Sequence, residues 1–251
     1  MIIDAPQPEQ IASLKALWQE AFGDTEEYLR LFFTTAFSPD RCHCLTESGE
    51  VAAALYWFDC VVEGKSYAYL YAIATKKAFR GRGLCNALMT NTHRHLQELG
   101  YAGAILVPAE ESLFDFYRAM GYRNFGGVSR FTCQPGEVAA ALQPVDAENY
   151  GKLRQKLLPS GGVTQDLVTL HFLEAQTALY KGDDFLLSCY REEDILMVQE
   201  YLGDKSKAPG IVAALGCREG RFLKSGRDPF AMWLPLTDDA PAPTYFGISL
   251  S

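Results

Sequence analysis

The sequence lacks both a long apolar run and a basic leader. No stretch of its 251 residues approaches the ~18 consecutive apolar residues that a membrane-spanning helix needs. The opening residues, MIIDAPQPEQ, have neither the basic nor the apolar region of a secretory signal peptide. We therefore expect a cytoplasmic protein that has no membrane partner.

An excess of positive charge is also absent, since the formal net charge is −8. Nucleic acids and anionic membrane surfaces are bound by clustered cations, so neither is expected as the main partner. The share of hydrophobic residues, 48%, and of charged residues, 22%, is typical of a soluble globular protein rather than a disordered one.

The cysteine pattern does not predict a disulfide framework. There are seven, an odd and scattered set that suits reduced thiols rather than paired disulfides. Cys42-His43-Cys44 is the one cluster with metal-ligating residues, but no second pair completes the four ligands of a structural zinc site. We expect no metal, and we interpret these three residues as part of a strand.

Hydrophobic spacing in the first half predicts helices, then strands, then alternating helices and strands. Glu63-Gly64 is a turn dipeptide between two long apolar runs, which predicts a hairpin. Ser112-Leu-Phe-Asp115 resembles a capping box at a helix start. The predicted elements are helices at 11–22, 25–33, 84–99 and 112–120 and strands at 51–62, 65–75 and 101–107.

The second half repeats a similar order of elements without a visible sequence repeat. The spacing predicts helices at 135–142, 147–158 and 208–215 and strands at 185–190, 194–202, 230–236 and 244–251. The whole chain is therefore expected to be α/β, with mixed sheets of the α+β type.

Charge is distributed unevenly around residues 79–89, FRGRGLCNALM. No Asp or Glu occurs between Glu63 and Glu98, whereas that span holds six cations: Lys65, Lys76, Lys77, Arg80, Arg82 and Arg94. Unpaired N–H groups and the dipole at a helix start favour an anion, and glycines let the backbone approach phosphate oxygens. The stretch is thus either an anion-binding loop or a turn with solvated arginines.

Two well-known phosphate loops do not fit. A Walker loop needs Gly-Lys-Ser/Thr, but Gly83 is followed by Leu84 and Cys85. A dinucleotide fingerprint needs a third glycine where Asn86 stands, and the preceding strand follows a meander instead of opening a βαβ unit.

Residues 72–89, AIATKKAFRGRGLCNALM, resemble the acetyl-CoA motif of the GNAT family of acyl-CoA N-acyltransferases, in which an apolar strand leads to (Arg/Gln)-x-x-Gly-x-(Gly/Ala) at a helix start. Arg80 and Gly83 fit the motif, while Cys85 replaces its final small residue. Residues 113–126, LFDFYRAMGYRNFG, resemble the family's later helix, with Tyr117 four residues before Gly121-Tyr122.

The resemblance covers about residues 1–130 and implies a GNAT-like catalytic domain there. The VPAEESLFDFYRAMGY segment is also similar to larger Eis-like acetyltransferases, which carry a second GNAT-like unit without the cofactor loop. That similarity implies two GNAT-like units in tandem, with residues 131–251 as the second, degenerate one.

The resemblance also implies which residues bind acetyl-CoA. The strand residues Ile73, Ala74 and Thr75 would pair with the pantetheine arm, and an N–H near Ile73 or Ala74 would polarise the thioester carbonyl. The pyrophosphate would lie against the loop formed by Arg80, Gly81, Arg82, Gly83, Leu84 and Cys85. Which of the cations touches phosphate is left open.

Tyr117 is the implied general acid, because a phenol with a pKa of about 10 can protonate a departing thiolate. Glu110 and Glu111 are the candidate bases, acting directly or through water, although the amine could instead arrive unprotonated. Asp59, Glu63 and the terminal carboxylate of Ser251 are weaker candidates. His93 and His95 are expected at the surface, and a thiol at a helix start beside arginines predicts a lowered pKa for Cys85.

The predicted function is transfer of an acetyl group from acetyl-CoA to a primary amine of a small molecule or peptide by direct attack in a ternary complex. The alternative is a catalytically inactive acyl-CoA-binding sensor or scaffold. The sequence leaves the oligomeric state open, with a homo-oligomer as one option.

Overall fold

The computed structural model describes residues 1–250, so the predicted role of the Ser251 carboxylate lies outside the described residues. The chain divides into two compact units, and each is described by itself. Among the described residues, unit 1 comprises 1–60, 64–122 and 233–240, and unit 2 comprises 61–63, 123–232 and 241–250.

Unit 1 contains the predicted helices and strands of the first half of the chain. It also contains β1, which is too short to show a pattern in the sequence, and, from Trp233 on, β14, which comes from much later in the chain. Its elements are β1 (Ile2–Asp4), α1 (Ile11–Phe22), α2 (Glu26–Thr35), β2 (Cys42–Glu47), β3 (Glu50–Val62), β4 (Lys65–Thr75), α3 (Leu84–Glu98), β5 (Gly103–Leu106), α4 (Ser112–Ala119) and β14 (Ala231–Pro235).

The strands of unit 1 form a mixed sheet in the order β1-β2-β3-β4-β5-β14. The first strands are antiparallel, and β3 turns into β4 through Glu63 and Gly64, whose positive φ angles of 47° and 81° confirm the predicted turn. Strand β5 pairs with β4 in parallel, as a crossover through α3 allows.

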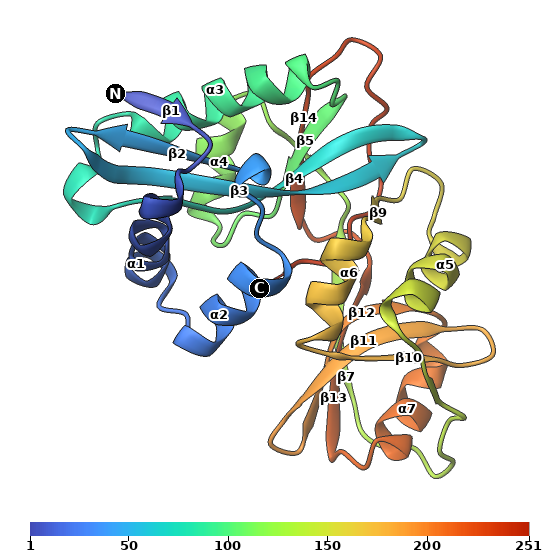
Figure 1. Ribbon diagram of the computed structural model, residues 1–251. Helices are drawn as coiled ribbons and strands as arrows, with labels where there is room; N and C mark the ends of the chain where they lie inside the picture. The colour runs from blue at the N-terminus through green and yellow to red at the C-terminus, as the bar shows by residue number, and fades with distance from the viewer. Residues whose placement is uncertain (251) are drawn as a thin grey trace. The chain divides into compact units, whose positions relative to one another are not determined.

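Helices cover both faces of this sheet (Figure 1). On one face, Trp18 of α1 and Phe32 of α2 lie 5.0 Å and 5.3 Å from Tyr56 of β3, measured between ring centroids. On the other face, Thr92 of α3 hydrogen-bonds to the ring of His43 at 2.9 Å. Cys42, His43 and Cys44 thus belong to a buried strand, as the sequence predicts.

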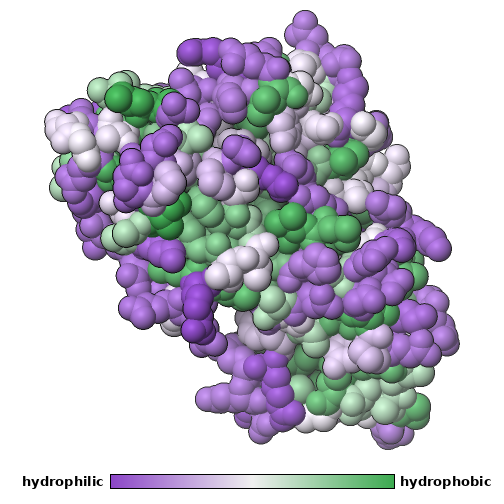
Figure 2. All heavy atoms as spheres, in the orientation of Figure 1, coloured by the Kyte–Doolittle hydropathy of each residue, from purple (hydrophilic) through white to green (hydrophobic). Residues whose placement is uncertain are grey.

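Unit 2 contains short helices and a second sheet. Its elements are β6 (Arg123–Phe125), β7 (Val128–Cys133), β8 (Gln143–Pro144), α5 (Ala147–Leu157), β9 (Thr164–Gln165), α6 (Leu167–Glu174), β10 (Ala178–Lys181), β11 (Leu186–Glu192), β12 (Ile195–Leu202), α7 (Ala208–Ala214) and β13 (Glu219–Ser225). On the face drawn in Figure 2, hydrophilic side chains cover much of the outer surface of both units.

The second sheet repeats the plan of the first. Its order is β7-β13-β12-β11-β10-β8, in which β10, β11 and β12 form an antiparallel meander. Strand β13 then pairs with β12 in parallel after the crossover through α7, as β5 pairs with β4 after α3. The recurrence of this mixed pattern confirms the predicted fold class of two α/β units built alike.

A buried ion pair joins the elements of unit 2. Arg154 of α5 donates from Nε and Nη2 to Glu200 of β12 at 2.8 Å and 2.9 Å, and both side chains are at most 2% exposed. The guanidinium also donates to the carbonyl oxygens of Val163 and Phe246, and the hydroxyl of Tyr150 donates to Glu200 at 2.9 Å. Because burying a charge is costly, this full set of partners is what makes the pair tolerable.

The segment 244–250 is not the regular strand that its apolar run predicts. Tyr245 makes one isolated bridge to Gly162, and Gly247 has a φ of 77°, which ends the extended conformation. A Cβ at Gly247 would collide with the carboxylate of Glu200, so this glycine lets the chain pass over the buried ion pair.

The helix predicted at 135–142 is also wrong, because no helix is assigned there. The backbone N–H groups of Gly136 and Ala140 donate to the carbonyl oxygens of Pro209 and Gly210 in α7, at 2.8 Å and 2.9 Å. These donors are used between segments, so the local alanine-rich composition does not decide the conformation.

Candidate active site

Strand β4 loses its regular geometry next to the predicted cofactor strand. Its pairing with β5 runs from Tyr67↔Gly103 to Tyr69↔Ile105 and ends there. Three residues later Ala72 has a φ of 47°, a conformation that costs energy for any residue other than glycine. Residues 73–75 therefore lie beyond the β5 register, where an extended ligand can take the place of a neighbouring strand.

The glycine loop has the backbone of an anion-binding site. Gly81 and Gly83 adopt φ angles of 74° and 73°, and a Cβ on either would meet no atom within 4 Å. Gly83 is the N-cap of α3, and no side chain caps the helix. The N–H groups at the start of α3 thus face open space in front of two glycines, which fits a phosphate group.

The cations of this loop are closer to acids than the sequence suggests. Lys76 forms an ion pair with Glu50, and Arg82 forms one with Glu47 at 2.7 Å. Both glutamates come from the β2–β3 hairpin. The acid-free span in the sequence is therefore not acid-free in space.

Two cations of the loop remain without a carboxylate partner. Among residues 1–250, no carboxylate pairs with the side chain of Lys77 or Arg80. Arg80 instead donates from Nε to the carbonyl oxygen of Thr75 at 3.0 Å, which fastens the loop to the end of β4. Lys77 and Arg80 are thus the loop cations whose side-chain charge no carboxylate among these residues pairs with.

Tyr117 lies in the last turns of α4 and is buried. Burial and the nearby Cys85 thiol raise the pKa of its phenol above the ordinary value of 10. The phenol therefore stays protonated at neutral pH. The raised pKa also widens the gap to a departing thiol, so the close match expected for a free tyrosine does not hold in this structure.

The pKa of the Cys85 thiol differs from the prediction made from the sequence. Burial raises the pKa of its thiol from 9.0 to about 11, whereas a position at a helix start beside arginines predicts a lowered value. The Cys85 side chain is partly buried, and the nearby Arg82 is paired with Glu47. Desolvation outweighs the helix dipole here, so the thiol is the stable form.

The expectation that His93 lies at the surface is also wrong, because its side chain is partly buried. Its Nε2 lies 2.7 Å from the hydroxyl of Tyr122, whose ring lies 5.8 Å from that of Tyr117. Burial lowers the pKa of His93 to about 4, so the imidazole is neutral. His95 is likewise partly buried and lies 4.8 Å from the ring of His43.

The two candidate bases are both exposed side chains. Glu110 and Glu111 are exposed near the start of α4, and Glu110 accepts a hydrogen bond from Ser112 Oγ at 2.5 Å. The predicted capping box is absent, since Glu111 is the N-cap and Asp115 pairs with Arg118 instead. Carboxylates near a helix start are also favoured by the helix dipole, so their base role stays a prediction.

The weaker candidates have structural partners. Asp59 accepts a hydrogen bond from Tyr101 at 2.5 Å and lies 3.5 Å from Arg41, and Glu63 forms the β3–β4 turn.

Within residues 1–250, no group of three or more His, Cys, Asp or Glu side chains could hold a metal ion. None of the helices there is long and apolar enough to cross a membrane.

The glycine loop, the irregular strand and the following helices can be compared with known families. Residues 3–125 match the family model described as an acetyltransferase (GNAT) domain. This part of the chain belongs to the GNAT family. A search of curated proteins finds no match to the sequence.

Solved structures are similar to this chain beyond that domain. A GCN5-related N-acetyltransferase from Anabaena variabilis matches with a TM-score of 0.72 at 16% identity, covering 94% of this chain and 73% of that one. One from Kribbella flavida has a TM-score of 0.69 at 16% identity, with 92% and 70% covered. Eis1 from Mycobacterium abscessus has a TM-score of 0.64 at 12% identity, with 94% and 74% covered.

These matches confirm the fold across both units, including the similarity to Eis, because each covers more than nine-tenths of this chain. At such low identity they carry no information about substrate. The chain spans about 70% of the length of these proteins.

In the described part of unit 2, the connection between β12 and α7 differs from the glycine loop of unit 1. Between β12 and α7, Asp204 caps the backbone N–H of Ser206 with its own carboxylate at 2.8 Å. Pro209, in the first turn of α7, has no N–H to offer. At the start of α7, one donor is thus capped and another is missing, unlike at the start of α3.

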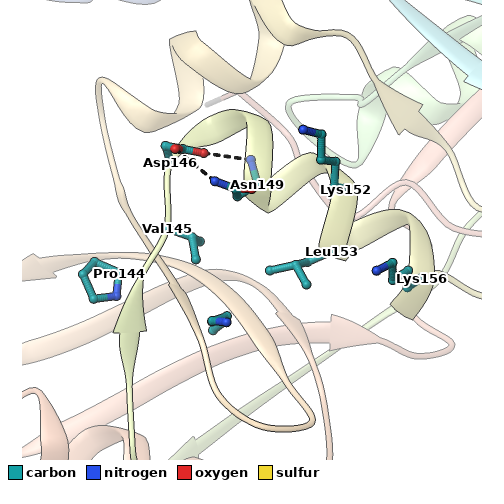
Figure 3. A pocket seen from close by; sticks show the side chains of 8 residues that line it. Pro144, Val145, Asp146, Asn149, Lys152, Leu153 and Lys156 are labelled. Atoms are coloured by element: carbon teal, nitrogen blue, oxygen red, sulfur yellow. Dashed lines mark hydrogen bonds between the residues drawn. The ribbon is translucent and has the colours of Figure 1, made fainter.

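Unit 2 does contain an open pocket of about 500 Å³ beside α5 (Figure 3). Lys152 and Lys156 of α5 and Lys181 of β10 line it together with Asp146, whose carboxylate caps α5. Lys152 is paired with Glu148 at 2.7 Å. The pocket lies outside the GNAT domain and has none of the groups expected for acyl transfer.

Proposed function

We propose that this protein transfers an acetyl group from acetyl-CoA to a primary amine of a small molecule or peptide. One observation carries the proposal. No side chain caps the start of α3, which follows two glycines with open space around them, and the part of β4 that extends beyond its pairing with β5 precedes this loop. Membership of the GNAT family supports it. Acetyl-CoA would supply the activated acyl group as a thioester.

The residues of the GNAT domain fit such a ligand in two places. The N–H groups of the loop at 80–85 would hold the pyrophosphate, with Lys77 and Arg80 as the unpaired cations beside it. Backbone groups of Ile73, Ala74 and Thr75 would bind the pantetheine arm, and the N–H of Ile73 or Ala74 would polarise the carbonyl.

Tyr117 would hold the proton that the leaving thiolate takes up. Its raised pKa keeps the phenol protonated at neutral pH, so its proton is available to the sulfur as negative charge develops there. The exposed Glu110 and Glu111 would at most receive the amine proton through water. An amine that loses its proton to solvent needs neither of them.

The loop assignment is tested by calorimetry with acetyl-CoA on Gly83→Glu. A side chain and a negative charge in front of α3 should weaken binding at least a hundredfold. Gly100→Glu is the matched control, because Gly100 has a φ of 88°, open space around it and lies at the opposite end of α3. Equal affinity of the two folded variants would remove the loop from the cofactor site.

The reaction is tested by thiol release with a panel of amines on the wild type and on Tyr117→Phe. We expect turnover to fall at least tenfold in the variant while acetyl-CoA affinity is retained. Unchanged turnover would remove Tyr117 from the mechanism. Tight acetyl-CoA binding by a wild type that turns over no amine would favour the alternative of an acyl-CoA-binding sensor.

A further inference from the structure

The residue just before the irregular point of β4 is a tyrosine that faces α1 and α2. Tyr71 precedes Ala72, whose φ of 47° breaks the strand beyond the last pair with β5. The rings of Trp18 and Phe32 lie 5.6 Å and 6.0 Å from its ring. Tyr71 is only partly buried, so this position borders both the aromatic core and the proposed acetyl site.

The hydroxyl of Tyr71 belongs to a polar group at the edge of that core. It lies 2.5 Å from the hydroxyl of Tyr28, which is in the first turn of α2. Burial raises the pKa of Tyr28 to about 12 and that of Tyr71 further, so both phenols stay neutral. Two neutral hydroxyls in contact offer lone pairs that can accept hydrogen bonds from an ammonium group.

A carboxylate lies next to this phenol pair. Asp24, in the α1–α2 connection, accepts a hydrogen bond from Trp18 Nε1 through Oδ2 at 2.7 Å. Its charge acts on both phenols, as their raised pKa values reflect. Trp18 in turn lies 6.4 Å from Tyr28. Trp18 thus contacts the carboxylate and both tyrosine rings, and one negative charge combined with aromatic rings favours a cation.

The aromatic surface continues along α2 beyond the polar group. Phe33 and Phe37 are partly exposed, and their rings lie 4.8 Å apart. The ammonium of Lys15 already lies 5.0 Å above the ring of Phe33, which shows that this surface accommodates a cationic nitrogen. It offers an apolar area to whatever body carries the amine.

We propose that Asp24, Tyr28 and Tyr71 form the acceptor subsite, and that it takes a primary ammonium group on an apolar body, such as a phenylalkylamine. The inference rests on the proposed function, because it places this subsite beside the acetyl group on β4. The Asp24 carboxylate and the aromatic rings bind the ammonium, and Phe33 and Phe37 contact the apolar body. A flexible diamine has no apolar body and loses that contact.

The subsite is tested by direct binding, which does not depend on turnover. Calorimetry of the full chain with 2-phenylethylamine is compared with 2-phenylethanol, which lacks the charge, and with 1,4-diaminobutane, which lacks the ring. We expect 2-phenylethylamine to bind at least tenfold more tightly than either. No binding to the wild type, or tighter binding of the diamine, would overturn the proposal.

Variants locate the binding. Asp24→Asn keeps an oxygen for Trp18 but removes the charge, and loss of a hydrogen bond to a charged group should weaken binding roughly tenfold or more. Tyr71→Phe should weaken it severalfold. Glu27→Gln, on the exposed side of the same helix turn, is the charge-matched control and should change nothing. Unchanged affinity in folded Asp24→Asn and Tyr71→Phe would overturn the subsite.

A parallel titration with acetyl-CoA separates this proposal from the proposed function. If acetyl-CoA binds but amine affinity does not depend on Asp24, only the subsite is wrong. If the amine binds in an Asp24-dependent way but no acetyl transfer follows, the subsite stands and the transfer reaction is wrong.

Discussion

Cys85 lies in the first turn of α3 close to Tyr117, and burial raises the pKa of its thiol to about 11. At pH 8 only roughly one thiol in a thousand would then be ionised, and the thiolate is the reactive form. We expect iodoacetamide to alkylate Cys85 at least tenfold more slowly in the folded protein than in the protein unfolded in urea. Peptide mass spectrometry over time measures both rates.

That experiment also distinguishes the two accounts of this position. If the helix dipole and the arginines controlled the thiol, Cys85 would react faster in the folded protein than in urea. Acetyl-CoA should slow the reaction further, because the proposed ligand would lie over the start of α3.

The buried imidazoles make stability depend on pH. Burial lowers the pKa of His43 and of His93 to about 4, from 6.5 in the unfolded chain. As pH falls from 6.5 towards 4, the unfolded state binds protons that the folded state does not, so stability is present above pH 6.5 and is lost across this window. Each histidine contributes a slope of up to about 1.4 kcal/mol per pH unit.

We therefore expect His93→Gln, which can still hydrogen-bond to Tyr122, to flatten this dependence by about one proton. Urea unfolding at pH 7, 6 and 5 gives the slope of the free energy of unfolding. His171→Gln, at an exposed position of unit 2, controls for the loss of an imidazole as such. An identical slope in the wild type and His93→Gln would mean that His93 titrates alike in both states.

At the level of elements, the backbone conformation of Ala72 predicts different effects on stability for substitution by valine and by glycine. With a φ of 47°, valine should be far worse than alanine, because a β-branched residue is strained there. We expect Ala72→Val to destabilise by about 1–3 kcal/mol. Ala72→Gly should be near neutral, since relief of strain is offset by the greater entropy of the unfolded chain.

Urea denaturation measures both effects, and acetyl-CoA affinity reports whether the strand keeps its shape. The proposed cofactor strand follows Ala72 directly, so Ala72→Val should also weaken acetyl-CoA binding. If Ala72→Val were as stable as the wild type, β4 would be regular at this position.

Local elements with their own signals could be predicted from the sequence. Glu63-Gly64 marks the hairpin, and Gly23, with a φ of 74°, ends α1 where the helical spacing stops. The glycine loop was found in the same way, because Gly81 and Gly83 are needed for backbone reasons at a helix start. The phenol pair of Tyr28 and Tyr71 carries no such signal, since its two residues are brought together only by packing of α2 on the sheet.

The features that could not be predicted from the sequence depend on interactions between segments that are distant in the chain. The basic span gave no indication that Glu47 and Glu50 would neutralise two of its cations, because those acids come from a neighbouring hairpin. The pattern of Arg154 is that of an ordinary exposed helix residue, yet it forms a fully buried pair with Glu200. Burial also reversed the expected shift of the Cys85 pKa.

At the scale of the whole molecule, each of the two units is built from segments that are not contiguous in the sequence. The sequence assigns 131–251 to the second domain, but Trp233–Ala240 belongs to unit 1, where β14 lies next to β5. The backbone N–H of Leu236 donates to Ala102 at 2.8 Å, and Gln97 donates to the carbonyl oxygen of Leu236 at 2.8 Å. The family match over 3–125 thus omits one strand of its own sheet.

We expect a chain of residues 1–130 to be insoluble or aggregated, because β5 would present an unpaired, buried-type edge. Joining residues 231–240 to it through a flexible linker should restore a monodisperse, cooperatively melting protein. Size-exclusion chromatography and thermal melting compare the two, and the same ten residues in scrambled order are the control. A monodisperse 1–130 with an unchanged melting temperature would show that β14 is dispensable.

The position of β14 has a consequence for synthesis. On the ribosome, the edge of β5 is made long before the strand that covers it, and the whole of 123–230 must be translated in between. At about 5–20 residues per second, the nascent GNAT domain would wait roughly 5–20 s with that edge open. Its last folding step is therefore timed by translation, and rare codons or a stalled ribosome in the second half would prolong the interval in which a chaperone, or another nascent chain, can pair with it.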